Sequence, residues 1–203
     1  VLKKWPYGRL MQGWGENPSL YSPLEKTHDL FHTTFGGHMG IDIGGGHRTP
    51  ILASHEGIVT IVHGDRSNQG GLEVWITSPQ LDGDAPGDSR VSTVYSHLDE
   101  YTVRIGDTVL KGDIIGFMGN TGFVVSGGTA YWGNAPAGKG VHLHFGLYEY
   151  KRDKYGNFQP RYVNVLRNSS DPLPYITETQ QNPYGDLTYL ALFLNTMKNF
   201  LKG

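Results

Sequence analysis

Residues 141–145 read Val141-His142-Leu143-His144-Phe145, so that histidines alternate with apolar residues. Successive side chains of a β-strand point to opposite faces, and the two histidines therefore share one face while the apolar residues share the other. The apolar face is expected to pack into a core. The other face presents two imidazoles about 6–7 Å apart at the backbone, from a rise of ~3.3 Å per residue. Such a pair suits two metal ligands, or one ligand and one proton carrier; the alternative is two polar residues on a solvated strand face.

The segments around this stretch have the composition of short β-strands. β-Branched and aromatic residues gather in runs that turn residues separate, and the 29 glycines of the chain make turns frequent. The sequence therefore predicts a mostly β fold. The expected strands are Gly57–His63, Leu72–Thr77, Val91–Leu98, Asp113–Met118 and His142–Tyr150.

One α-helix is expected near the C-terminus. Leucine or methionine recurs at helical spacing from position 187 to position 201. Asp186 can cap the start of this helix, and Lys198 and Lys202 suit the negative end of its dipole. We therefore expect one main domain over residues 1–166, which includes an ordered N-terminal segment. A Pro/Ser-rich connector and the amphipathic helix would follow over residues 167–203.

Composition excludes several classes of protein. The chain has 203 residues with a formal net charge of -2, so it carries no electrostatic footprint for nucleic acid. No apolar run is long enough for a transmembrane span. Cysteine is absent, and any metal must therefore be held by histidine, aspartate or glutamate.

Candidate ligands outside the 141–145 stretch are His38, Asp42 and His97. His38 and Asp42 are four residues apart among glycines, and in an extended strand their Cα atoms would be about 13 Å apart. A shared metal therefore requires the chain to bend between them, which Gly40 permits. His97 lies near the end of the predicted strand Val91–Leu98. The alternative interpretation is that His38 is an ordinary loop histidine, Asp42 is a strand-end aspartate and His97 is a surface or core histidine.

The whole inventory is one carboxylate, up to four histidines and no thiol. It suits one Zn²⁺ with three protein ligands and an open fourth position, plus histidines that move protons. The residues alone leave open which of His142 and His144 would bind the metal. The remaining histidines are interpreted as structural: His28, His32, His47, His55 and His63.

The order of four motifs resembles a known family. The segments HMGID (38–42), YSHL (95–98), GNTG (119–122) and HLHF (142–145) occur in the order found in the LytM/lysostaphin-type zinc endopeptidases, the M23 peptidase family. The segments at 12–18, at 57–59 and at 106–112 are also similar to family segments, so the likeness covers about residues 10–150.

This resemblance implies a mostly antiparallel β-sheet core crossed by a groove. It implies one Zn²⁺ bound by His38, Asp42 and His144, with His97 and His142 as the catalytic histidines. It further implies a zinc-dependent endopeptidase that hydrolyses cross-link or stem peptides of bacterial peptidoglycan, and hence an extracytoplasmic protein that is secreted, periplasmic or phage-delivered. The alternative is a non-catalytic, cell-wall-binding or amidase-activating relative.

The chain departs from the family pattern in two places. The link between Gly122 and His142 is much longer than in the family, and this glycine-rich segment, 123–140, is expected to be a loop that forms one wall of the groove. Tyr131 and Trp132 would then contact substrate. Many members also have a tyrosine shortly before the first metal-binding histidine; His32 is the residue here that could substitute for it.

Overall fold

The computed structural model describes residues 8–18, 37–78, 89–152, 154–155, 158–160 and 169–175. Two features expected from the sequence lie outside these residues: His32, and the helix that starts near Asp186 and ends near Lys202. In the part of the chain that is described, no helix is both long and apolar enough to cross a membrane.

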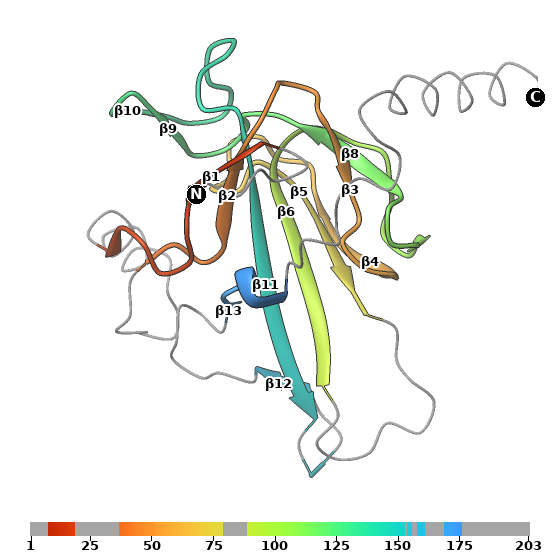
Figure 1. Cartoon of the computed structure of the whole chain (residues 1–203). Coiled ribbons are helices and arrows are strands. Elements are labelled where there is room, and N and C mark those ends of the chain that lie inside the picture. The colour runs from red at the N-terminus through yellow and green to blue at the C-terminus, as the bar shows by residue number, and fades with distance from the viewer. Residues whose placement is uncertain are drawn as a thin grey trace, which may run out of the picture.

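The described elements are antiparallel β-strands and one short 3₁₀ helix, arranged around a large sheet of eleven strands (Figure 1). Its main path runs β1-β2-β11-β6-β5-β4-β7. In that order the bounds are Arg9–Gln12, Ile41–Gly44, His142–Arg152, Ser89–Tyr101, Leu72–Thr77, Gly57–His63 and Thr108–Val109.

The other strands join this path at its middle. Strand β8 (Ile114–Met118) pairs with β6 and with β3 (Pro50–Leu52), whereas β12 (Phe158–Pro160) and β13 (Ser169–Ser170) pair with β11. The 3₁₀ helix η2 (Leu173–Tyr175) follows β13. The fold is therefore mostly β with an antiparallel core, as the sequence predicted, and all five expected strands are present.

Alternation along the central strands explains where the core lies. Ile41 and Ile43 of β2, Val74 and Ile76 of β5, and Leu143 of β11 are each at most 3% exposed. Every second residue of these strands therefore faces one common core, and each such aliphatic side chain stabilises the fold by about 1.5–3 kcal/mol. The residues between them, among them both histidines of β11, project from the other face of the sheet.

Segment 123–140 was expected to be a loop over its whole length, but part of it forms a β-hairpin. Val124–Ser126 (β9) and Thr129–Tyr131 (β10) form a separate two-stranded sheet with Ser126 opposite Thr129. Gly127 and Gly128 make the turn with φ of 57° and 78°, a conformation that suits a two-residue hairpin and favours glycine. β-Branched residues on both sides of a glycine pair are thus a hairpin signal, and the sequence reading overlooked it.

The beginning of the predicted connector is part of the sheet. Ser169 and Ser170 pair with Tyr148 and Leu147 of β11, and the Trp14 indole Nε1 donates a hydrogen bond of 2.9 Å to the Ser169 hydroxyl. These contacts tie the N-terminal segment to the far end of the domain. The division at residue 166 stays a prediction.

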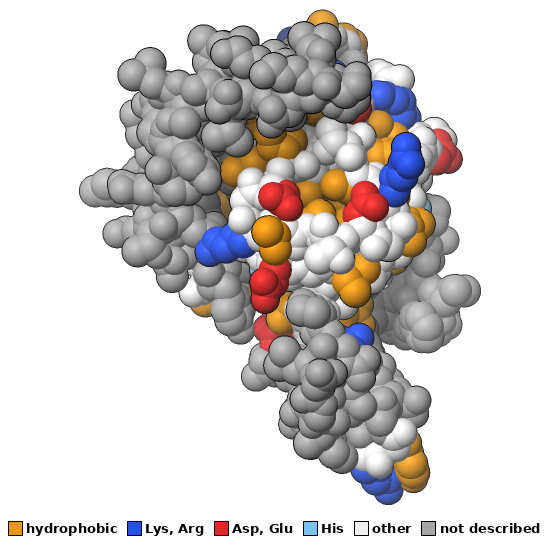
Figure 2. Space-filling model, turned by 90° about the vertical axis from the view of Figure 1, so that its right-hand side faces the viewer, with side chains coloured by type: hydrophobic (Ala, Val, Ile, Leu, Met, Phe, Trp, Pro, Cys, Tyr) orange, Lys and Arg blue, Asp and Glu red, His pale blue; other side chains and the backbone are white. Residues whose placement is uncertain are grey.

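Charges on the described surface are mixed. On the face shown in Figure 2, acidic and basic side chains alternate with separate apolar ones. This distribution agrees with the near-neutral balance of the sequence.

Candidate metal centre and groove

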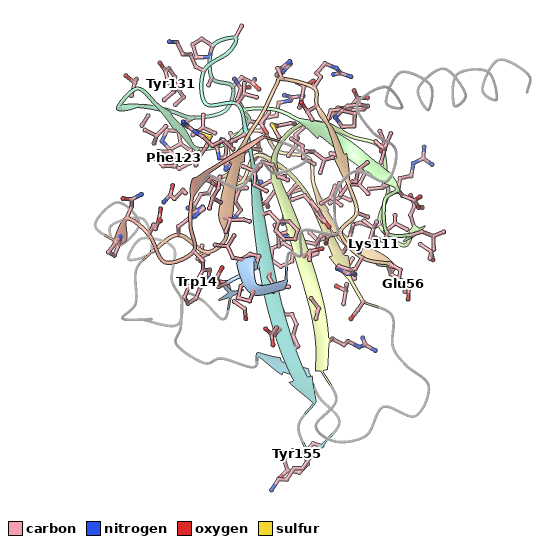
Figure 3. The ribbon with its side chains drawn as sticks, in the orientation of Figure 1. Trp14, Glu56, Lys111, Phe123, Tyr131 and Tyr155 are labelled. Carbon is pink, nitrogen blue, oxygen red and sulfur yellow. The ribbon has the colours of Figure 1, made fainter. Side chains whose placement is uncertain are left out.

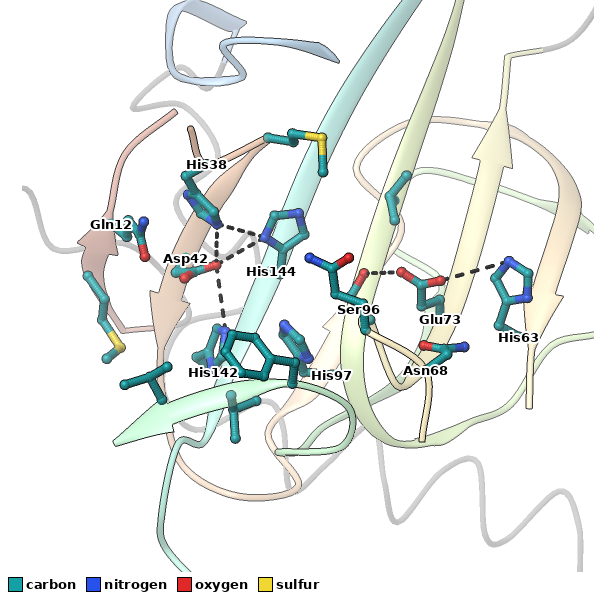
Figure 4. Close-up of a pocket in the computed structure, with 18 of the residues that line it drawn as sticks. Gln12, His38, Asp42, His63, Asn68, Glu73, Ser96, His97, His142 and His144 are labelled. Atoms are coloured by element: carbon teal, nitrogen blue, oxygen red, sulfur yellow. Dashed lines mark hydrogen bonds and ion pairs between the residues drawn. The ribbon is translucent and has the colours of Figure 1, made fainter. Parts of the chain in front are cut away.

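Three side chains converge at one edge of the groove face. His38 Nε2 lies 3.0 Å from Asp42 Oδ1 and 2.9 Å from His144 Nδ1, and His144 Nδ1 lies 3.1 Å from Asp42 Oδ1 (Figure 4). One donor atom of each residue thus falls within 4.8 Å of the other two. Among the described residues, this is the only group of three or more histidine or acidic side chains gathered so closely.

Regular pairing of β2 with β11 places two of the three. His144 stands directly opposite Asp42, and Leu143 stands opposite Ile43. Side chains at directly paired positions point to the same face with Cβ atoms about 4.5–5.5 Å apart. The register that buries the apolar residues therefore also brings the Asp42 carboxylate to the His144 imidazole.

A bend in the chain places the third converging side chain, His38. β2 begins only at Ile41, and residues 37–40 turn before it, so that His38 folds back over Asp42 as the sequence analysis required. A Cβ atom at Gly40 would lie 2.5 Å from the Phe145 carbonyl oxygen and 2.9 Å from His144 Cε1. Glycine is needed here because the backbone passes so close to the His144 ring.

A β-bulge delivers His97 to the same face. Between Leu72 and Val74, β5 advances two residues while β6 advances three, from Tyr95 to Leu98. His97 takes a positive φ of 61°, which a residue other than glycine rarely adopts. As a result Ser96 and His97, neighbours in sequence, both line the groove. His97 therefore lies inside β6, at an irregularity, and not at the end of a strand as expected.

Histidines 97 and 142 face each other beside the three converging residues. Their ring centroids are 4.5 Å apart, and the centroids of His97 and His144 are 6.1 Å apart. His142 Nε2 lies 3.6 Å from Asp42 Oδ1. All five residues singled out from the sequence thus surround one point.

Backbone carbonyl groups orient three of the imidazoles. Nδ1 of His38 contacts the Gly13 carbonyl oxygen at 3.1 Å, Nδ1 of His97 contacts Thr121 O at 2.7 Å, and Nδ1 of His142 contacts Gly140 O at 2.8 Å. A carbonyl oxygen only accepts hydrogen bonds, so the proton of each neutral ring sits on Nδ1. The Nε2 lone pair is then left for a metal ion or a proton.

Burial and charge set the protonation states. Burial raises the pKa of Asp42, but the electrostatic interactions with His142, His144 and His38 outweigh it, and the net pKa is well below its ordinary value. Burial, with His142 and His144 nearby, holds the pKa of His97 well below its usual range. Burial also lowers the pKa of His144, although Asp42 opposes that shift. Near neutral pH Asp42 is therefore a carboxylate and the rings of His97 and His144 are unprotonated; carboxylate and neutral imidazole are the forms that bind metal ions.

The cluster lies in a groove of about 510 Å³ that crosses β11, β6 and β5. Beyond His97 the groove is lined by residues that sequence reasoning did not select, chiefly Ser96, Glu73, Asn68 and His63 (Figure 4). His63 had been interpreted as structural. The alternation of Glu73 and Trp75 with the buried Leu72, Val74 and Ile76 is visible in the sequence, but the strand pairing that turns them toward the histidines is not.

Segment 123–140 lines the groove, as expected, but through its first residues. Phe123, Val124 and Val125 line the groove, whereas Tyr131 and Trp132 do not. Trp132 is 52% exposed and packs its ring against Phe123, with centroids 4.7 Å apart. Phe123 and Tyr131 lie on the same end of the molecule (Figure 3). Contact of Tyr131 or Trp132 with substrate stays a prediction, as does the role of His32.

Comparison with known proteins places the chain among peptidases. The sequence model of peptidase family M23 matches residues 36–157, more than half of the chain. Lysostaphin of Staphylococcus simulans is 32% identical over 143 residues, which are 70% of this chain and 22% of that protein. The DD-carboxypeptidase/endopeptidase Mpg of Neisseria meningitidis serogroup B is 29% identical over 123 residues, 57% of this chain and 26% of that protein.

These relatives are much longer proteins, and the chain spans only about a quarter of their length. Among solved structures, the catalytic domain of lysostaphin from Staphylococcus simulans superimposes with a TM-score of 0.51 at 24% identity, covering 83% of this chain and 91% of that one. This likeness supports the fold. The family model, which matches more than half of the chain, shows that the chain belongs to peptidase family M23.

Proposed function

We propose that the chain is a zinc-dependent endopeptidase that hydrolyses the cross-link or stem peptides of bacterial peptidoglycan. The observation that carries this proposal is the convergence of His38, Asp42 and His144 within 4.8 Å, with two further imidazoles beside them in an open groove. Family membership supplies the reaction class, since M23 proteins are peptidases.

The donor set suits zinc. Two imidazole nitrogens and one carboxylate oxygen form a common set of protein ligands for catalytic zinc, which keeps its fourth position for water or substrate. The contact of His38 Nδ1 with the Gly13 carbonyl is the kind of outer hydrogen bond that orients a ligating histidine. A zinc ion held there would supply a Lewis acid that polarises a carbonyl and acidifies a water molecule.

Histidines 97 and 142 would then handle protons. Because Nδ1 of each donates to a backbone carbonyl, Nε2 of each is the atom that takes a proton from the attacking water and returns one to the leaving amine. The depressed pKa of His97 keeps that ring neutral, and so ready to accept, near neutral pH. Either ring, once protonated, can also stabilise the developing oxyanion.

Cell-wall peptides are proposed as the substrate because of the relatives. One is described as an antimicrobial peptidase, and another as a DD-carboxypeptidase/endopeptidase. A substrate of this kind implies action outside the cytoplasm. The groove is open and long enough to take an extended peptide across three strands.

Digestion of purified peptidoglycans tests the proposal. Walls with different cross-link chemistry are incubated with the protein, and the released fragments are sequenced by mass spectrometry. New amino termini within the peptides, lost with a chelator and restored by Zn²⁺, are expected. Binding to the wall without any new terminus, at full zinc occupancy, would support the non-catalytic alternative instead.

A further inference from the structure

A second polar cluster lies in the same groove, two strands away from the metal-binding residues. It consists of Glu73, Ser96, Asn68 and His63, all of which line the groove (Figure 4). Ser96 is paired with His144 across β6 and β11, and its hydroxyl donates a 2.6 Å hydrogen bond to Glu73 Oε1. Adjacent strands are about 4.8 Å apart, so Ser96 lies one strand from His144, and Glu73, on β5, lies two strands or roughly 10 Å away across the sheet.

The cluster offers acceptor atoms that the described donors only partly satisfy. The Glu73 side chain is 15% exposed. Its other oxygen, Oε2, lies 3.8 Å from His63 Nε2, which is close enough for an ion pair with a protonated His63 but too far for a hydrogen bond. Asn68 Oδ1 is buried and has no hydrogen-bond partner. A half-buried carboxylate oxygen and a buried carbonyl oxygen are costly unless donors satisfy them.

The charge of the groove selects the kind of donor. Of the described residues that line it, none is lysine or arginine, while Asp42 and Glu73 both carry carboxylates. A protonated primary amine carries a positive charge and three donors with no acceptor, which matches a carboxylate beside a carbonyl oxygen. The neighbouring Trp75 ring, stacked on Tyr148 at 5.1 Å, bounds the same part of the groove.

We propose that Glu73, with Asn68 and Ser96, forms a specificity subsite for a free amino group of the substrate, about three residues from the cleaved bond. The distance follows from the ~10 Å separation and the ~3.3 Å rise of an extended peptide. This inference rests on the proposed peptidase function in that it names the substrate feature which the groove selects. Ser96 holds the carboxylate, and Glu73 makes the charged contact.

Matched peptides test the subsite in the zinc-loaded protein. Tri-, tetra- and pentaglycine with free amino termini are compared with their N-acetyl counterparts. Acetyl-tetraglycyl-lysine amide is compared with its Nε-acetylated form, so that an amine on either side of the bond is sampled. Calorimetry gives Kd, and mass spectrometry of the same samples shows whether cleavage occurs; kcat/KM replaces Kd where it does.

We expect the free amine to be preferred roughly tenfold in at least one of the two sets, which corresponds to about 1.4 kcal/mol. Glu73→Gln keeps the size of the side chain and an acceptor for Ser96, and it should reduce the preference to near one. Glu56→Gln is the matched control: Glu56 is exposed and lies on the side of the molecule away from Phe123 (Figure 3), and the preference should be unchanged.

Equal affinity for free and acetylated peptides in the wild-type protein overturns the subsite, as does the absence of binding to every amine peptide. A preference for the free amine that persists in Glu73→Gln also overturns the subsite. The ratio of Kd values, or of kcat/KM values, for free and acetylated peptides is obtained whether or not a peptide is hydrolysed. An amine preference without any cleavage would therefore support the subsite while counting against the peptidase function.

Discussion

The strand pairs β2–β11 and β5–β6 border the same groove but deliver their side chains by different means. On β2–β11 the register is regular, and Asp42 meets His144 because the two are directly opposed. On β5–β6 the register slips by one residue, and His97 reaches the groove through a positive φ. Regular pairing thus brings together two of the three proposed metal ligands, Asp42 and His144, whereas an irregularity adds a proposed proton carrier. Ligation and proton transfer can therefore be disturbed separately.

Removing one of the three converging metal-ligand side chains should have the largest effect. Asp42→Ala or His38→Ala takes away one of three converging donors, and zinc affinity should fall by more than the ~10–100-fold that loss of an outer hydrogen-bond partner costs. Elemental analysis after dialysis is expected to show little zinc and no hydrolysis. Glu56→Ala, remote from the groove, should retain the metal; full zinc occupancy in Asp42→Ala would contradict the assignment.

Removing an imidazole from the irregular side should spare the metal. His97→Asn and His142→Asn are expected to keep zinc and to lose roughly 100- to 10,000-fold in kcat/KM, the usual contribution of a positioned acid or base. Asparagine is the right replacement at position 97 because it tolerates the left-handed conformation. A His142→Asn variant with full activity on purified peptidoglycan would show that this ring moves no essential proton.

Gly40→Ala tests the tight approach beneath His144. The new Cβ would overlap the Phe145 carbonyl oxygen, a backbone atom that cannot rotate away, and overpacking of this kind costs typically about 1–3 kcal/mol. Urea unfolding should show that loss, together with weaker zinc binding. Gly46→Ala is the control, since its Cβ would meet only Thr49 Oγ1 at an ordinary 3.4 Å; equal behaviour of the two variants would argue against a constrained bend.

Valine substitutions compare the two strand pairs directly. His97→Val forces a β-branched residue into a positive φ, which costs about 1–3 kcal/mol of unfolding free energy. His142→Val places the same residue in a regular strand, where β-branched side chains are favoured. Chemical denaturation of the metal-free variants should rank His97→Val as the less stable. The opposite order would mean that the bulge is not maintained in solution.

Acidification should give the smallest and most gradual effect. The native pKa values of His97 and His144 lie below those of the unfolded chain, so the unfolded state binds more protons as the pH falls through about 6.5. Stability of the metal-free protein is then lost on the acid side, by up to about 1.4 kcal/mol per pH unit for each proton. The lowered pKa of Asp42 extends the loss to still lower pH.

Replacement of His97 isolates its share of this pH dependence. His97→Gln cannot titrate, so the slope of unfolding free energy against pH should become shallower between about pH 6.5 and pH 5. Denaturation in urea at a series of pH values measures both slopes. Identical slopes for the variant and the parent protein would show that His97 titrates normally in the native state.

The same contrast explains what the sequence could predict. Alternating apolar residues predict the strands, and motif order predicts the M23 family, since both depend on local spacing. The sequence also predicts that His142 and His144 share one face, because side chains in a β-strand alternate with a period of two residues. By contrast, the bulge at His97 depends on how β5 and β6 align, and Glu73 becomes a groove residue only through that alignment. Neither feature is encoded within one segment, so local patterns could not reveal it.

The β9–β10 hairpin is fixed at its base and open at its tip. A backbone bridge joins Thr121 to Asn134. The Asn120 side-chain amide donates to the carbonyl groups of Ala135, Pro136 and Lys139 at 3.1, 3.3 and 2.9 Å. At Gly127 and Gly128 an added Cβ would meet no atom within 4 Å. Residues inserted between β9 and β10 would therefore extend into open space, and the turn is a place where the chain can be lengthened without rebuilding the histidine cluster.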